Sequence, residues 1–171
     1  YICFNCKCFT IISENFSRMI TLDAIDKKLI TFLQADSKQT NKELSGKLNL
    51  SVTAVYERIK KLEREGIISS YVALIDKKTI NRSFVTFCSI KLLQHTQDYV
   101  VQFEKEVKQI DEILECYHIS GDYDYLLKVI VANMDEFRAF MVEKLTGISH
   151  IGSTTSAFVI NEVKHTTAIS V

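Results

Sequence analysis

The sequence of 171 residues lacks the motifs that mark the common classes of enzyme. It has no glycine-rich phosphate loop and no nucleophile motif. Its four histidines are scattered along the chain, at His95, His118, His150 and His165. We therefore predict neither catalytic residues nor a cofactor.

Segments that address a chain to a membrane are also missing. No apolar run reaches the roughly 18 residues that a membrane-spanning helix needs. Residues 1–18 lack the basic start and the small-residue cleavage site of a secretory signal. They contain no methionine, and Met19 directly precedes a well-patterned segment. We expect translation to start at Met19, with residues 1–18 a non-native or disordered leader.

Cysteine is sparse and unevenly placed. Cys3, Cys6 and Cys8 crowd into the leader, but no second Cys/His pair follows at the spacing of a zinc finger, so no metal site is predicted. Cys88 and Cys116 occur singly in hydrophobic segments and are expected to be small buried residues. Nothing here requires an oxidising compartment, which makes the cytoplasm the expected location.

The chain has no net charge, with 21 Lys and Arg against 21 Asp and Glu, which argues against a protein that only binds nucleic acid. The charge is divided unevenly, however. Residues 18–80 hold 12 basic and 8 acidic side chains, and residues 81–171 hold 8 and 12. This asymmetry favours a nucleic-acid-facing part followed by a part with another function.

Three helices are predicted in the first part. Residues 22–36 have apolar side chains at helical period, at Leu22, Ile25, Leu29, Phe32 and Leu33. Thr40 and Glu43 have the spacing of a capping box, which starts a second helix over 40–48. Asn49 can adopt the left-handed conformation that ends it.

The third predicted helix, residues 51–66, has two different faces. Ser51 is its expected cap and Gly66 its stop signal. Its inward residues are expected to be Val52, Val55, Ile59 and Leu62, and its polar face carries Thr53, Tyr56, Glu57, Lys60, Lys61 and Arg64. Two short helices joined by a tight turn, the second with a basic face, suit a helix-turn-helix in the major groove. A merely solvated face, or a protein-interaction module, fits the same pattern.

The second part has the order strand, helix, strand, strand, helix, strand. Residues 71–82 are predicted to be a strand and linker. The strands are expected at 83–92, 112–120, 123–131 and 153–163, and the helices at 99–110 and 134–145. This βαββαβ order predicts a ferredoxin-like sheet with both helices on one face. The other face would be uncovered and apolar, so we expect a homodimer.

The run "LDAIDKKLITFLQADSKQTNKELSGKLNLSVTAVYERIKKLEREGIISSYVALID" resembles the N-terminal domain of the Lrp/AsnC family of transcriptional regulators. The shared features are the opening Leu-Asp-x-x-Asp, the Leu-Ser before the third helix and "ERIKKLEREGII". The resemblance implies an α+β fold, with a winged-helix-like helix-turn-helix domain at 19–70. It also implies a ferredoxin-like domain at 83–171 that binds an effector and assembles into dimers and octamers.

The stretch "HISGDYDYLL" stands between two predicted strands. Gly121 permits unusual backbone angles, Asp122 and Asp124 can accept bonds from an ammonium group, and Tyr123 offers an apolar wall. On the residues alone, a hairpin turn is favoured over a site. It matches the family's effector loop, which implies that a small amino acid binds there between dimers. The implied residues are His118, Gly121, Asp122, Tyr123, Asp124, Met134, Ser156 and Ala157, with the hydroxyls of Thr154, Thr155 and Ser156 as candidates for its carboxylate.

The sequence therefore predicts a sequence-specific DNA-binding regulator that responds to an amino acid. Base contacts are expected from Thr53, Tyr56 and Glu57, phosphate contacts from Arg58, Lys60, Lys61 and Arg64, and further contacts from Ser51 and Ala54 at the helix start. Arg58 has a second interpretation, because it lies toward the helix interior and can pair with Asp or Glu. The alternative function is an amino-acid-binding oligomer whose helical domain contacts protein.

Overall fold

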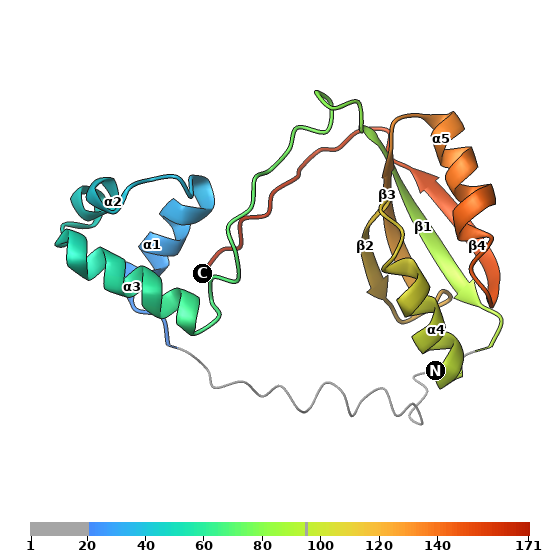
Figure 1. Ribbon diagram of the computed structural model, residues 1–171, viewed down its shortest axis with the longest axis horizontal. Coiled ribbons are helices and arrows are strands. Elements are labelled where there is room, and N and C mark those ends of the chain that lie inside the picture. Colours follow the sequence, from blue (N-terminus) through green and yellow to red (C-terminus); the bar gives the residue numbers. More distant parts are fainter. Residues whose placement is uncertain (1–20, 95) are drawn as a thin grey trace. The chain divides into compact units, whose positions relative to one another are not determined.

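The computed structural model describes residues 21–94 and 96–171 (Figure 1), so the predictions for residues 1–18, for Met19 and for their cysteines lie outside the described residues. The chain divides into two compact units. The first ends at Val72 and also contains Thr166–Val171, and the second is Ala73–His165. Thr166–Val171, the last residues of the predicted domain 83–171, are thus grouped with the helical unit.

The first unit contains three helices, α1 (Ala24–Ala35), α2 (Asn41–Leu48) and α3 (Val52–Arg64). Each begins at a side-chain cap, which satisfies amides that the first helical turn leaves without partners. Asp23 caps α1, Thr40 and Glu43 form the predicted capping box of α2, and Ser51 caps α3. The three helices enclose a core of Leu29, Ile30, Leu44, Val55 and Leu62.

The turn between α2 and α3 sets their geometry. Asn49 ends α2 in the left-handed conformation, with φ of 52°, as predicted. The amide of Leu50 then bonds the carbonyl of Ser45 at 3.1 Å, which closes the turn. Gly66 follows the end of α3 with φ of 73°, a backbone angle that favours glycine. The predicted helix-turn-helix is confirmed.

One four-stranded antiparallel sheet forms the second unit. Its strands are β1 (Phe84–Leu92), β2 (Ile113–His118), β3 (Tyr125–Val131) and β4 (Ile151–Phe158), in the spatial order β2-β3-β1-β4. The helices are α4 (Gln97–Val107) and α5 (Met134–Ala139), which continues as a π-helical stretch, η2 (Phe140–Leu145). The ferredoxin-like βαββαβ order is confirmed.

Both helices cover the same face of this sheet (Figure 1), which we call the helix face. Its core joins alternate strand residues to apolar residues of α4, α5 and η2, such as Phe103, Phe137 and Phe140. Cys88 is buried there as predicted, whereas Cys116 is exposed. The residues between, pointing the other way, form the open face of the sheet.

Besides the burial of Cys116, two details of the sequence prediction are wrong. The strand expected within residues 71–82 is not formed, because a strand needs a bonded neighbour and no ladder reaches residues 71–82. Val52, expected to point inward, is 46% exposed, since it is the first residue of α3 and precedes the turn that packs on the core.

The described residues contain no helix long and apolar enough to cross a membrane. Within residues 21–94 and 96–171, no cluster of three His, Cys, Asp or Glu side chains could hold a metal ion.

The last residues join the first unit through Gln34, whose side-chain amide donates to the Ile169 carbonyl at 2.9 Å and accepts from the Ile169 backbone amide at 2.6 Å.

Candidate functional site

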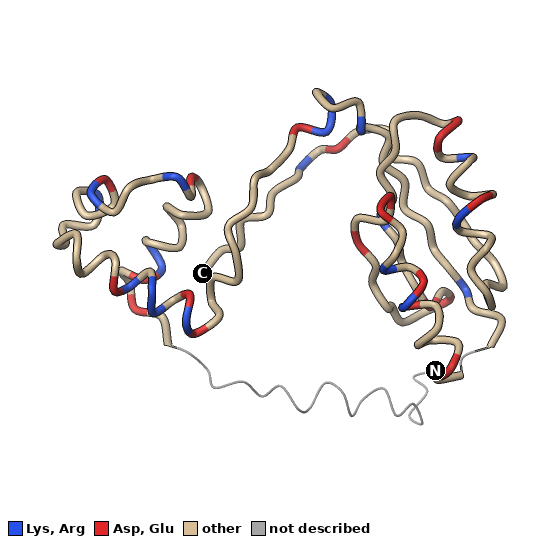
Figure 2. Tube along the Cα trace, viewed as in Figure 1, with Lys and Arg blue, Asp and Glu red and all other residues tan. Residues whose placement is uncertain are grey.

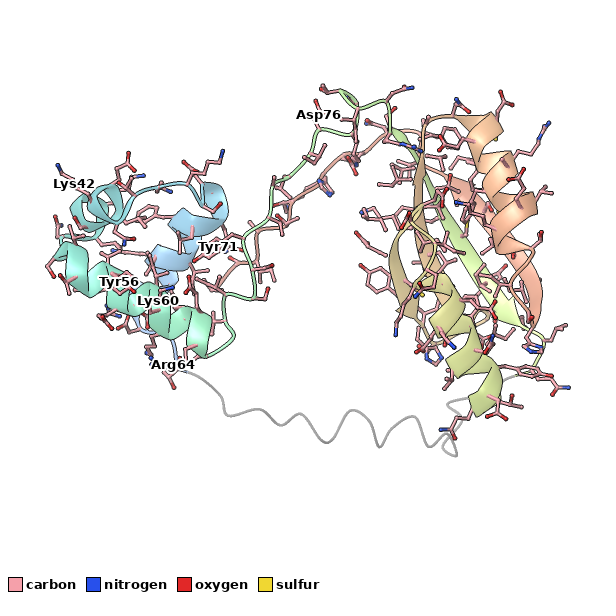
Figure 3. The ribbon with its side chains drawn as sticks, viewed as in Figure 1. Lys42, Tyr56, Lys60, Arg64, Tyr71 and Asp76 are labelled. Carbon is pink, nitrogen blue, oxygen red and sulfur yellow. The ribbon has the colours of Figure 1, made fainter. Side chains whose placement is uncertain are left out.

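The side of α3 opposite its core contacts is the first candidate site. Val55 and Leu62 are fully buried, and Ile59 packs beside them. At helical period, the residues that point away from this stripe are Thr53, Glu57, Lys60 and Arg64, with Tyr56 at the edge. We call these five residues the outer face of α3. All five are exposed, and Figure 3 shows Tyr56, Lys60 and Arg64 on successive turns.

The start of α3 is capped by a side chain. The hydroxyl oxygen of Ser51 accepts the amide of Ala54 at 3.1 Å, which fixes the first turn. Ala54 itself is half-buried and presents only a methyl group. The end of α3 is fixed by Tyr71, whose hydroxyl donates to Glu63 at 3.1 Å.

The basic residues of α3 differ in their partners. Lys60 pairs with Glu63 at 2.8 Å, a pair that is largely exposed, and its ammonium lies 5.9 Å from the centre of the Tyr56 ring. An exposed pair of this kind is weak because water screens both charges, so it yields readily to a phosphate. Arg64 has no ion-pair partner among the described residues. Figure 2 shows acidic and basic residues mixed along α3.

Arg58 and Lys61 lie on the flank of α3 that faces α1. The Arg58 guanidinium donates to Asp23 at 2.7 Å and to Asp26 at 2.5 Å, and the Lys61 ammonium lies 3.6 Å from Asp26. The second interpretation of Arg58, pairing with acidic residues, is thus the one the structure has. The pKa of the Asp23 carboxyl is below its ordinary value. The largest cause is the hydrogen bond from the Asp26 backbone amide, and the second is the hydrogen bond from the Arg58 guanidinium.

Gly121 stands at the centre of the second candidate site, the loop between β2 and β3. Its φ of +126° favours glycine, as predicted. No atom lies within 4 Å of where a Cβ would stand, so the space beside its backbone is open. Asp122 is exposed, and Tyr123 donates to or accepts from the Thr155 hydroxyl at 2.9 Å. Tyr123 and Thr155 are thus brought together.

Asp124 forms hydrogen bonds within the sheet unit through both its carboxylate and its backbone amide. Its carboxylate accepts the amide of Leu92 at 2.7 Å, and its own amide donates to the Ile90 carbonyl at 2.9 Å. These bonds tie the start of β3 to the end of β1. The expectation that Asp124 receives an ammonium group is therefore weaker than the same expectation for Asp122.

His118 stacks on a core residue. Its ring lies 4.7 Å from the ring of Tyr125, which is almost fully buried and donates to Glu104 of α4 at 3.0 Å. Burial, followed by the bond to Glu104, raises the pKa of Tyr125 well above its ordinary value. His118 therefore lies on the helix face, where its ring stacks on Tyr125 while the residue itself is exposed.

The hydroxyls predicted to act together on β4 are separated. Thr154 and Ser156 pair with Ile90 and Cys88, which belong to the helix-face core, whereas Thr155 pairs with Ser89 of the open face. Side chains alternate along a strand, so three consecutive residues cannot meet one carboxylate. Ser156 lies 3.5 Å from the Cys88 sulfur, and Ala157 is on the open face with Thr155.

Met134 is also separated from the loop. It is exposed at the start of α5, just beyond Val131, whereas the Gly121 loop precedes Tyr125 at the other end of β3. Within one chain, a strand of seven residues stands between them. Met134 and Gly121 could join one site only if they came from different copies.

Two family matches cover most of the chain. Residues 22–69 match the winged helix-turn-helix DNA-binding family, and residues 85–169 match the Lrp/AsnC ligand binding domain. These ranges fall on the two candidate sites. The first contains the outer face of α3, and the second contains the Gly121 loop and β4.

Similar proteins include the leucine-responsive regulatory protein of Escherichia coli K12, 38% identical over 84% of this chain and 87% of that protein. An uncharacterised HTH-type transcriptional regulator of Haemophilus influenzae is 37% identical over 85% of this chain and 87% of that protein. Among solved structures, a Neisseria meningitidis transcriptional regulator in complex with L-Met has a TM-score of 0.83 at 32% identity, covering 87% of this chain and 96% of that one.

Proposed function

This chain belongs to the Lrp/AsnC family of transcriptional regulators, and on that premise we propose that the outer face of α3 enters the major groove of DNA. The protein is a DNA-binding regulator that responds to an amino-acid effector, and it is not an enzyme. We also propose which residues contact the DNA and the effector, how copies of the chain assemble, and that the protein acts in the cytoplasm.

The observation that carries the proposal is the exposure of the outer face on a helix whose opposite side is buried at Val55 and Leu62. Thr53 and Glu57 stand nearest the start of α3, where a recognition helix meets base edges. Thr53 can bond several bases, and Glu57 can accept from cytosine. Lys60 and Arg64 lie further along and are proposed to contact phosphate, with the Ser51 hydroxyl at the helix start.

Salt dependence tests the phosphate contacts. Each neutralised phosphate contributes about −0.9 to the slope of log affinity against log salt concentration. The double variant Lys60→Gln with Arg64→Gln should therefore reduce the slope by about 2 on a mixed-sequence duplex. The matched control is Lys105→Gln with Arg138→Gln, two exposed residues on α4 and α5. An equal loss in the control, or none in the test variant, contradicts the proposal and favours a helical domain that contacts protein.

Base reading has a separate test. Thr53→Ala and Glu57→Ala should change the sequence selected from a random duplex library, because these residues are proposed to contact bases. Thr53→Ala should leave the salt slope unchanged, since threonine neutralises no phosphate. Selection of the same sequence by both variants and by the wild-type protein would show that these side chains do not read DNA.

We propose that the effector binds at the Gly121 loop, on the side of Tyr123 and Thr155. The open space beside Gly121 leaves its backbone accessible, and Asp122 is an exposed carboxylate that can accept an ammonium group. The relatives are named for leucine, and one neighbour is a complex with L-Met. Apolar amino acids of this size are thus the first candidates, with Tyr123 as an apolar wall.

A thermal-shift screen of the standard amino acids identifies the effector, because a ligand that binds only the folded state raises the melting temperature. Calorimetry with L-Met and L-Leu then tests the site. Asp122→Asn should abolish the binding heat, whereas Asp135→Asn, an exposed residue at the start of α5, should retain it. Unchanged heat in Asp122→Asn would rule out the proposed amine contact.

We further propose that the open face pairs with a second copy and that dimers assemble into an octamer. Leu126, Ile130 and Phe87 occupy this face by register and remain half-exposed in one chain. The face is less uniformly apolar than predicted, since Lys128 pairs there with Glu115 at 2.8 Å and is itself only 8% exposed. An apolar face of this kind is expected to be covered.

Light scattering tests the assembly. Leu126→Glu places a charge in the proposed interface and should reduce the mass in solution to that of one chain. Val142→Glu, at a residue 66% exposed on η2, should leave the dimer intact. A Leu126→Glu protein of unchanged mass would place the interface elsewhere.

A further inference from the structure

Asp26 of α1 is a carboxylate in the interior of the helical unit, with no exposed surface. One of its oxygens accepts the Arg58 guanidinium at 2.5 Å. The other has no hydrogen-bond partner among the described residues, and the Lys61 ammonium stands 3.6 Å from it. A single buried negative charge therefore faces two basic residues of the recognition helix.

The two basic residues are not held equally. Arg58 also donates to Asp23 at 2.7 Å, and its side chain is only 28% exposed. Lys61 is within ion-pair distance but beyond hydrogen-bond distance, and its side chain is 40% exposed. Arg58 is thus hydrogen-bonded to two carboxylates, whereas Lys61 is attracted to Asp26 alone and forms no hydrogen bond with it.

Moving either cation to a DNA phosphate would leave Asp26 less compensated. An unpaired buried charge is strongly unfavourable, because the interior cannot replace the solvation that water provides. The attraction between the cation and the phosphate would therefore have to exceed the free energy lost at Asp26. Lys60 and Arg64 face no such cost, since their side chains point away from the core.

We propose that Asp26 withholds Arg58 and Lys61 from DNA phosphates and thereby limits the sequence-independent part of DNA affinity. The inference rests on the proposed function of α3. Sequence-independent affinity grows with the number of phosphates neutralised, whereas base contacts from Thr53 and Glu57 do not depend on these two cations. Asp26 would then limit the number of phosphate contacts without touching DNA.

Asp26→Asn tests the inference on a mixed-sequence duplex that contains no selected site. Replacing the carboxylate by an amide frees Lys61, whereas Asp23 still holds Arg58, so the salt slope should steepen by about 0.9 relative to wild type. Asp36→Asn, at an exposed residue just after α1, removes the same charge without releasing a paired cation and should leave the slope unchanged. Circular dichroism establishes that each variant is folded.

Single charge removals decide the matter even if Asp26→Asn does not fold. Arg64→Gln should lower the slope by about 0.9, whereas Lys61→Gln, at a partly exposed residue, should leave it unchanged. A loss in Lys61→Gln equal to that in Arg64→Gln, or a folded Asp26→Asn with the wild-type slope, overturns the inference. Absence of salt-dependent duplex binding in the wild-type protein would instead overturn the proposed function itself.

Discussion

The outer face of α3 and the surroundings of Gly121 were both predicted from short polar stretches of sequence. They differ in whether the residues predicted to act together lie together in the structure. On α3, residues three and four apart stay on one face, so the pattern that suggested a site survives folding. Around Gly121, consecutive residues of β4 point to opposite faces, and Met134 is at the far end of β3. A helix keeps a spaced group together, whereas a strand divides a consecutive one.

The largest expected effect tests whether these two regions belong to independently packed cores. Leu62→Ala removes a fully buried side chain of the helical unit, and Leu127→Ala removes one from the sheet. Each should lower the free energy of unfolding of its own unit by about 2–5 kcal/mol, because the packing partners cannot fill the cavity. Hydrogen exchange, read unit by unit, measures this. Equal loss of protection in both units would show that the two cores unfold together.

A pair of glycines sharpens the contrast between helix and loop. Gly121→Ala forces a side chain into a φ of +126° and should destabilise the sheet unit by about 1–3 kcal/mol. Gly46→Ala lies inside α2 with open space around it, and should stabilise the helical unit by about 0.5–1 kcal/mol. Denaturant unfolding gives both values. If the two changes had the same sign, the backbone explanation of Gly121 would be wrong.

The smallest expected effect concerns acid. The pKa of Asp23 is lower in the folded protein than its ordinary value of 3.8, through the Asp26 amide and then Arg58. Its stabilising contribution is therefore complete above that ordinary value and is lost as the pH falls through the lowered pKa. Asp23→Asn should flatten the acid dependence of melting in the helical unit alone. A flattening in the sheet unit instead would contradict the assignment.

Local features of the fold were predictable because neighbours in sequence determine them. The capping box of Thr40 and Glu43, the left-handed Asn49 and the glycine after α3 all depend on residues within one or two turns. The strand expected at 71–82 was not predictable in the same way. Its alternation suits a strand, but pairing depends on a distant partner that the described chain does not supply.

Within the candidate sites, the limit was again the distant partner. The sequence places Arg58 near the helix interior, but only the folded chain identifies the buried Asp26, 32 residues away, as its partner. Asp124 similarly resembles a ligand contact until its bond to Leu92, 32 residues away, is known. Both residues have side chains suited to binding a charged ligand, but both form hydrogen bonds within the protein instead.

The central claim is that the outer face of α3 lies against DNA, and site-specific photo-crosslinking tests it most directly. A photoreactive residue at Thr53 should crosslink to a bound duplex, whereas the same residue at Val101, which is 58% exposed on α4, should not. Crosslinking from Val101 alone, or from neither position while the duplex remains bound, would contradict the account.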